Sequence, residues 1–486
     1  MNLDVNHENS TNPALLADLH RILGTHQILS DPLDLLVYEC DAYTLEKKVP
    51  SVVVLPNSTL EVAEIVRCCK KHQVAFIPRG AGTNLSGAIL PIENAVIISL
   101  SRMNKVLQVD IENRRALVEA GCVNIWITHA VRSAGLLYAP DPSSQTACTI
   151  GGNVATNSGG PHTLKYGVTT NHVLGFEIVL PEGEVIWLGA TMEGGEDTGG
   201  LDLRGAAIGC EGMFGIVTRV LVNLIPAPQS WRTLLGVFSS VDDASQAVSD
   251  IIASGIVPAA LEMMDQLITQ AVEAAYKFGF PLNAGALLIV ELDGLEADLE
   301  NQAVEVERLC LANHANEVRR ARTDKQRADL WKCRKRAFGA IGRLSPNFLT
   351  QDGVVPRSKL PEIMRFIQQT SAKYGLRIPN VFHAGDGNIH PLILYNETHA
   401  EEVDRAVKAG NEILDRCLEL GGSVSGEHGI GVEKAGFMEK QFSKADIEAM
   451  KSLRRIFDPE QRCNPRKMFP NGKRCMDFAP RRQISV

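Results

Sequence analysis

Four loops rich in glycine and small polar residues lie within the stretch 78–218, and they constrain the fold more than any other feature of the chain. They are PRGAGTNLSG at 78–87, PDPSS at 140–144, IGGNVATNSGG at 150–160 and GCEGMFGIVT at 209–218. Glycine lets the backbone turn sharply and approach a ligand closely, and successive N–H groups form a concavity that suits an anion. Four such loops in one domain therefore predict an extended cofactor, such as a dinucleotide that lies across two subdomains.

The first loop, 78–87, follows an apolar strand and is expected to bind phosphate through its backbone N–H groups. It is not a Rossmann fingerprint, because Gly87 falls five residues after Gly82 instead of three, and position 102 is Arg rather than an acid. It is not a P-loop either, since no Gly-Lys-Ser/Thr follows. Taken alone, this loop is explained equally well by a plain turn.

The order of apolar segments predicts an α+β protein. SVVVLP at 51–56 and VAFIP at 74–78 are typical of strands, and Ser58 and Glu61 open a helix between them in capping-box spacing. The prolines of PAPQS at 226–230 predict a linker, after which strand and helix patterns alternate again. A chain of 486 residues suits two or three domains. We expect a first domain at 1–226 (core 47–226), a second at 231–431 and a C-terminal helical segment at 432–486.

Composition excludes several classes of protein. The formal net charge of −8 leaves no overall basic field, so nucleic acid is not an expected partner. We find no signal peptide pattern and no long apolar run, and we expect a cytoplasmic chain. The 11 cysteines include no C-x-x-C, which favours reduced thiols and argues against an iron–sulfur cluster in this chain. The basic stretch 466–486 is either a solvated tail or a contact for a partner or a membrane surface.

A second set of motifs predicts a metal site. His383 and His390 flank the turn AGDGN in VFHAGDGNIHP, so both imidazoles can converge on one cation if the flanking segments pair as strands. A single histidine on an apolar strand is more often a core residue. SGEHGIG at 425–431 supplies Glu427 as a third ligand, and the set of two nitrogens and one oxygen suits Zn²⁺, Mn²⁺ or Fe²⁺ with open positions.

The glycine loops, in their order along the chain, resemble the FAD-binding domain of the vanillyl-alcohol oxidase and p-cresol methylhydroxylase superfamily. Within it, VFHAGDGNIHP and SGEHGIG are similar to the D-2-hydroxyacid dehydrogenase branch, which includes glycolate oxidase flavoproteins. The resemblance extends from about residue 35 to 470. It implies a two-subdomain FAD-binding domain of the p-cresol methylhydroxylase type, an α+β substrate (cap) domain and a C-terminal helical return. The cofactor-binding residues that it implies are Arg79, Gly80, Ala81, Gly82, Thr83, Asn84, Gly87, Pro140, Ser143, Ser144, Gly151, Gly152, Asn153, Asn157, Gly159, Glu211, Gly212, Gly215, Ile216 and Asn464.

Two departures from the family pattern bear on the cofactor. Cys210 stands where the family has Ser, a small-for-small change that we expect to be tolerated. Relatives with covalent flavin carry a histidine just after the early glycines, where this chain has Thr83 and Asn84. We therefore expect FAD to be bound without a covalent link.

The resemblance implies oxidation of a 2-hydroxy acid, with His428 as the catalytic base and Arg334 as the residue that binds the substrate carboxylate. A metal that holds the hydroxyl and carboxylate oxygens lowers the hydroxyl pKa, and a histidine with a pKa near neutrality can accept the proton. Lys335 and Arg336 are expected to face solvent. Relatives that oxidise 2-hydroxyglutarate carry a lysine where this chain has Thr350, which favours a small acid such as glycolate or D-lactate.

Electrons must leave the reduced flavin, so we expect an iron–sulfur partner subunit, a second flavin-domain subunit or a quinone as acceptor, in a homo- or hetero-oligomer, with peripheral membrane contact through partners. Three alternatives stay open: a D-2-hydroxyglutarate dehydrogenase, a flavin subunit that is active only with its partners, and a same-fold FAD transferase like the alkyl-dihydroxyacetone-phosphate synthases. The pairing of His383 and His390 with Glu427 speaks against the last two.

Overall fold

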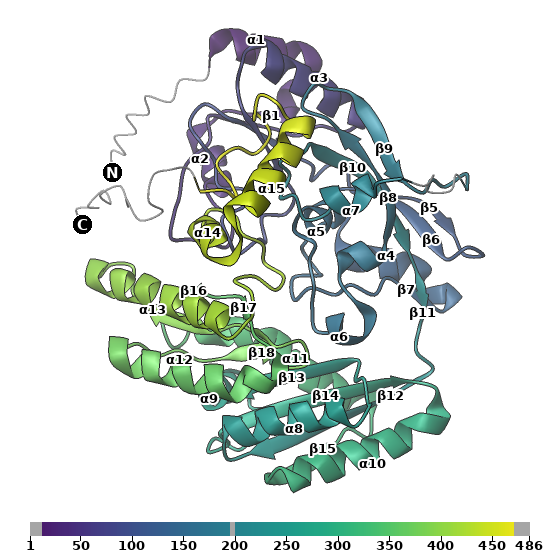
Figure 1. The fold of residues 1–486 in the computed structure, drawn as a ribbon. Coiled ribbons are helices and arrows are strands. Elements are labelled where there is room, and N and C mark those ends of the chain that lie inside the picture. Colours follow the sequence, from purple (N-terminus) through teal and green to yellow (C-terminus); the bar gives the residue numbers. More distant parts are fainter. Residues whose placement is uncertain (1–11, 195–199, 471–486) are drawn as a thin grey trace.

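The computed structural model describes residues 12–194 and 200–470, which form two α+β domains (Figure 1). The first sheet of the N-terminal domain has the strand order β1-β2-β4-β3, in which β2, β4 and β3 run parallel. The helix between β2 and β3 begins as predicted, because the Ser58 hydroxyl accepts a hydrogen bond from the Glu61 N–H. The elements of this part are α1 (Pro13–Ile22), β1 (Ile28–Leu29), α2 (Pro32–Leu35), β2 (Val52–Val54), α3 (Thr59–Lys71), β3 (Phe76–Arg79) and β4 (Val96–Ser99).

The second sheet of this domain is antiparallel, with the order β5-β6-β10-β8-β9. Phe176 of β8 and Val220 of β10 are fully buried beneath Ile127 and Val154 of two helices. The glycine-rich loops follow β3, surround α5 and precede β10. The elements are β5 (Val106–Asp110), β6 (Arg115–Glu119), α4 (Asn124–Val131), β7 (Leu136–Leu137), α5 (Ile150–Thr156), α6 (Thr163–Tyr166), β8 (Val173–Val179), β9 (Val185–Gly189), α7 (Leu203–Ala207), β10 (Ile216–Asn223) and β11 (Ile225–Pro226).

The second domain is a seven-stranded sheet, in the order β15-β12-β14-β13-β18-β19-β17, with helices on both faces. Neighbouring strand residues alternate between two cores: Met263 faces the helices α8, α10, α12 and α13, and Met264 faces α9 and α11. The elements are β12 (Ser230–Phe238), α8 (Val241–Ala253), β13 (Ala260–Asp265), α9 (Gln266–Tyr276), β14 (Ala286–Gly294), α10 (Glu296–Ala312), β15 (Ala315–Arg320), α11 (Asp324–Ile341), β16 (Asn347–Thr350), β17 (Gly353–Val354), α12 (Leu360–Tyr374), β18 (Val381–His383), β19 (Asn388–Ile389), β20 (Leu392–Tyr395) and α13 (Ala400–Glu419).

The C-terminal segment, yellow in Figure 1, returns to the N-terminal domain, where α14 (Met438–Gln441) and α15 (Lys444–Phe457) share a hydrophobic core with α5. Phe457 stacks on Phe214 with ring centroids 4.6 Å apart. Farther along, Cys463 forms a parallel bridge with Phe76 at the edge strand of the first sheet. The last described residues therefore complete the domain that the first residues begin.

A polar contact joins the two domains. His162 of the N-terminal domain lies between two carboxylates, with Nδ1 2.9 Å from Asp141 Oδ2 and Nε2 3.5 Å from Glu291 Oε1 of β14, and its ring stacks on Trp331 of α11. Burial lowers the pKa of His162, but the two carboxylates outweigh this effect and raise the pKa to about 10. The imidazole is therefore a cation that binds one acid from each domain.

The α+β fold class predicted from the sequence is confirmed: helices and both parallel and antiparallel strands are interspersed along the chain. Among residues 12–194 and 200–470, no helix is both long enough and apolar enough to cross a membrane.

Candidate functional site

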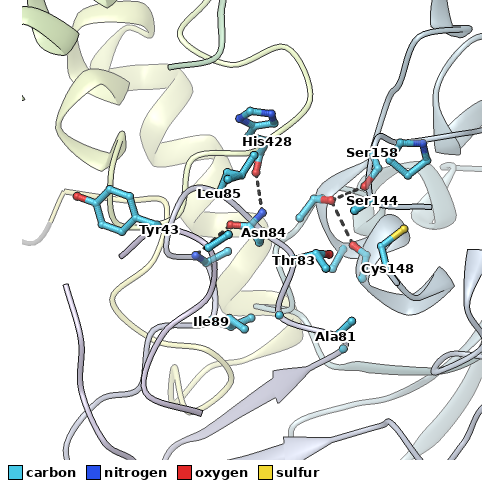
Figure 2. Close-up of a pocket in the computed structure, with 18 of the residues that line it drawn as sticks. Tyr43, Ala81, Thr83, Asn84, Leu85, Ile89, Ser144, Cys148, Ser158 and His428 are labelled. Carbon is cyan, nitrogen blue, oxygen red and sulfur yellow. Dashed lines mark hydrogen bonds between the residues drawn. The ribbon is translucent and has the colours of Figure 1, made fainter. Parts of the chain in front are cut away.

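A cavity of about 610 Å³ lies where the glycine-rich loops of the N-terminal domain meet β16 and the loop 425–431 (Figure 2). Most residues predicted to bind the cofactor line it: Arg79, Gly80, Ala81, Gly82, Thr83, Asn84, Ser143, Ser144, Gly151, Gly152, Asn153, Gly159, Glu211, Gly212, Gly215 and Ile216. The structure thus brings together all four loops that the sequence analysis singled out.

Four predicted cofactor residues do not line this cavity and contact neighbouring groups of the protein instead. The Pro140 carbonyl accepts a hydrogen bond from Asn124, and the Asn157 side chain accepts one from the Thr170 N–H. The Asn464 amide donates to the carbonyls of Ala88 and Glu211. A Cβ on Gly87 would lie 2.5 Å from the Val432 side chain. These four support the cavity wall.

The lining fits a long polar cofactor. A Cβ on Gly80 would lie 2.4 Å from Thr149 Oγ1, so a side chain at this position would displace Thr149 from its place beside the loop. Thr149 Oγ1 is buried, lines the cavity and has no hydrogen-bond partner within the described part of the chain. Because buried hydroxyl groups are normally paired, this atom indicates a ligand group that binds here.

The turn between His383 and His390 has the predicted hairpin form. β18 and β19 pair through His383 and Asn388. Gly387 has φ 73°, and a Cβ there would lie 2.1 Å from the Val355 carbonyl oxygen, so glycine is required. The two imidazole rings lie 5.1 Å apart, at 89° to one another. The hairpin therefore directs both histidines to one place.

Glu427 completes the three-residue group. Its Oε1 lies 3.3 Å from His383 Nε2 and 3.4 Å from His390 Nε2, and the ligand atoms all lie within 4.8 Å of one another. His390 Nε2 is buried and makes no hydrogen bond to any described residue. A divalent cation would satisfy this orphaned nitrogen, so the donor set fits the predicted metal.

Glu262 of β13 orients the first of these histidines. It is fully buried, its Oε1 lies 2.6 Å from His383 Nδ1, and its Oε2 accepts a hydrogen bond of 2.6 Å from Arg334 Nε. A carboxylate on Nδ1 turns the Nε2 lone pair toward the cation position, as in carboxylate–histidine–metal sites. Although burial lowers it, the carboxylates of Glu262 and Glu427 raise the pKa of His383 to about 10. This concentration of negative charge favours a cation.

His428 lies beside this group at the cavity wall (Figure 2). Its ring stacks on His390 with centroids 4.9 Å apart and an interplanar angle of 8°. The sequence suggested a pKa near neutrality, but burial lowers the pKa of His428 to about 4 against the opposing effect of Asp352. The imidazole is therefore neutral at pH 7, and it is a weaker base than the sequence analysis expected.

Arg334 and Lys335 of α11 lie in different surroundings. Arg334 is almost fully buried beside Glu262 and is not among the residues that line the cavity, whereas Lys335 is exposed, as the sequence analysis expected, and lines the cavity. Thr350 also lines the cavity, and its hydroxyl oxygen is buried without a hydrogen-bond partner among the described residues. The cap-domain end of the cavity thus carries one lysine and an unpaired hydroxyl group.

Sequence reasoning missed Glu262 and Asp352 as contributors to the site. Glu262 is the one acid in the apolar run PAALEMM, and a glutamate in such a strand is rarely buried unless it is paired, which was the available signal. Asp352 follows β16 and is fully buried against Lys434. No local pattern distinguishes it from an exposed turn residue.

Comparison with known proteins identifies the class. Residues 50–189 match the FAD binding domain family, and residues 227–468 match the C-terminal domain of FAD linked oxidases. The crystal structure of p-cresol methylhydroxylase with substrate bound superposes with a TM-score of 0.78 at 19% identity, covering 93% of this chain and 95% of that chain. Fold and cavity together define a flavoprotein of the p-cresol methylhydroxylase fold.

The family follows from closer relatives. The glycolate oxidase subunit GlcD of Escherichia coli strain K12 is 43% identical over 452 residues, which cover 93% of this chain and 90% of that protein. A D-lactate dehydrogenase of Anaerostipes hadrus is 31% identical over 468 residues, covering 95% and 98%. The chain belongs to the FAD-linked oxidase family and is an FAD-dependent oxidoreductase.

Proposed function

We propose that this protein oxidises a small 2-hydroxy acid, glycolate or D-lactate, to the 2-oxo acid. The observation that carries the proposal is the cluster of His383, His390 and Glu427 beside His428, at the wall of the cavity that fits FAD. The names of the relatives, a glycolate oxidase subunit and a D-lactate dehydrogenase, support the substrate class.

FAD, when bound in the cavity, would supply the acceptor for the hydride that leaves C2, and a cation held by His383, His390 and Glu427 would supply a Lewis acid for the hydroxyl oxygen. Side chains of the protein carry out the remaining steps. His428 accepts the hydroxyl proton as the C2–H bond breaks, so one hydride and one proton leave the acid together. Glu262 holds the His383 ring in the orientation that the cation needs.

Substrate binding requires a positive group for the carboxylate. We retain Arg334 for this role, since Glu262 fixes its guanidinium through a 2.6 Å hydrogen bond next to the His383 ring. Lys335 lines the cavity and is the second cation available. Thr350 contributes an uncharged hydroxyl group at the cap-domain end of the cavity. This group does not neutralise a second substrate carboxylate, so the site favours a small 2-hydroxy acid over a dicarboxylic acid.

We propose that electrons pass onward to a partner subunit with an iron–sulfur centre, to a second flavin-domain subunit or to a quinone, in a homo- or hetero-oligomer. The ten cysteines that the structure describes are all free thiols, and nine of them are buried. The similar GlcD protein of Escherichia coli is itself named as a subunit, which supports a multi-subunit assembly.

The test is an anaerobic absorbance titration of the purified, metal-loaded protein with glycolate, D-lactate, L-lactate and D-2-hydroxyglutarate. Bleaching of the oxidised flavin band by glycolate or by D-lactate alone supports the proposal. A band that none of the acids bleaches contradicts it and favours a subunit active only with its partners. A specificity constant for D-2-hydroxyglutarate well above the others contradicts the assignment of a small acid.

A further inference from the structure

The loop 425–431 has an unusual hydrogen-bond pattern, because side-chain oxygens accept from all of its N–H groups between Gly426 and Gly431. Asp352 takes the first three: its carboxylate lies 3.1 Å from the Gly426 nitrogen, 3.3 Å from that of Glu427 and 2.9 Å from that of His428. The same carboxylate accepts from the Ser425 hydroxyl at 2.7 Å. The two residues proposed as metal ligand and base thus share one carboxylate partner.

The remaining N–H groups of this loop have two other partners. The Ser425 hydroxyl oxygen accepts from the Gly429 N–H at 2.9 Å. The two carboxylate oxygens of Glu211 accept from Ile430 at 2.6 Å and from Gly431 at 2.8 Å. Successive amides of this kind form a nest that suits an anion, and here the protein's own carboxylates occupy it.

The two carboxylates come from different domains. Asp352 lies between β16 and β17 of the second domain, is fully buried, and is held by Lys434 and by the Asn388 amide at 2.8 Å. Glu211 belongs to the glycine-rich loop before β10 of the N-terminal domain and is 4% exposed. Its φ of 51° is costly for a residue other than glycine, and such backbone strain persists only where the surroundings impose it.

We propose that Asp352 and Glu211 are positioning residues that hold the loop 425–431 between the two domains. Asp352 sets the placement of Glu427 and His428 relative to the histidine hairpin, and Glu211 sets the placement of the whole loop relative to the flavin-binding domain. This inference rests on the proposed function for its kinetic consequence, but not for the geometry. Glu211, which the family resemblance implies as a cofactor-binding residue and which lines the cavity, thereby also holds the loop that carries the base.

The test compares Asp352→Asn and Glu211→Gln with Glu433→Gln as the matched control. Glu433 is a neighbouring carboxylate whose side chain bonds Gln351 and makes no hydrogen bond to the loop amides. Hydrogen exchange of the peptide 423–433 in the FAD-loaded protein gives a readout that is independent of substrate. We expect Asp352→Asn to release amides 426–428 and Glu211→Gln to release 430 and 431, while Glu433→Gln leaves protection unchanged.

The second readout is single-turnover flavin reduction, with flavin and metal content measured on the same samples. A displacement of about 1 Å costs roughly 100-fold in rate, so we expect that loss in Glu211→Gln with flavin content retained. Two outcomes overturn the positioning role. In the first, the loop amides of both variants lose protection from hydrogen exchange while flavin is reduced at the wild-type rate. In the second, the loop amides of both variants stay as protected as in the wild type. If Asp352→Asn fails to fold, Glu211→Gln and Ser425→Ala carry the same test. If no acid reduces the wild-type flavin, the proposed function fails, while hydrogen exchange still decides whether the two carboxylates hold the loop.

Discussion

Replacing Glu262 with Gln should weaken metal binding without removing any metal ligand. The carboxylate oxygens bond His383 Nδ1 and Arg334 Nε, both at 2.6 Å. Glutamine keeps one acceptor, so if its oxygen faces His383, its NH₂ group meets the Arg334 donor. Loss of such a carboxylate partner costs about 10–100-fold in metal affinity, or about 1.4–2.7 kcal/mol. A buried guanidinium left without its counter-ion costs about 3–5 kcal/mol of stability.

The assay is a competition titration of metal-free protein with Zn²⁺ or Mn²⁺ against a chromophoric chelator, alongside thermal unfolding. Glu291→Gln is the matched control, because Glu291 is 1% exposed and bonds Arg327 and Trp331 but touches no residue of the metal group. We expect Glu262→Gln to lower both the metal affinity and the thermal stability, and Glu291→Gln to lower only the thermal stability. Equal affinities in the two variants would refute the argument that Glu262 prepares His383 for the cation.

Three further predictions follow from the geometry. A chelator that strips the cation should abolish flavin reduction by the 2-hydroxy acid and leave the oxidised flavin spectrum unchanged; loss of the flavin band with the metal would contradict separate sites. Gly80→Val should lower the ratio of flavin to protein absorbance in the purified protein, because its side chain enters the space beside Thr149, and full flavin content would show that the cofactor lies elsewhere. His162→Gln should lower Tm at pH 7. Because the pKa of His162 in the folded state is raised to about 10, its ion pairs stabilise the fold fully below about pH 6.5 and lose this effect as pH rises through about 10. A Tm difference between wild type and variant that stays constant as pH rises would exclude the ion pairs as its source.

The parts of the site that the sequence could predict are those that depend on local backbone chemistry. Gly387 allows the tight turn between His383 and His390, and the glycine-rich loops indicate a ligand cavity where they come together. The sequence does not reveal which cation of α11 lines the cavity. Arg334 and Lys335 are adjacent, and the rotation of the helix is set by the partner of Arg334, Glu262, which is 72 residues away.

The polar groups that hold the site together were also beyond local patterns. Asp352 and Glu211 bond the same loop from two domains, at sequence separations of 76 and 219 residues. Neither has a neighbour in sequence that reveals its role, because both act on backbone N–H groups that every residue except proline carries. Only the assembled fold shows where these amides gather.

The return of the C-terminal segment has a consequence for biosynthesis. Asn464 donates to Ala88 and Glu211 at 2.8 and 2.6 Å, and the buried Lys467 ammonium donates to Leu90 at 2.9 Å. The flavin-binding domain is translated first, yet these bonds form only after nearly the whole chain has left the ribosome. Although domains generally fold in the order of their synthesis, the flavin-binding domain lacks these hydrogen bonds until the entire second domain has been synthesised. This part of the flavin-binding domain is thereby tied to completion of the polypeptide.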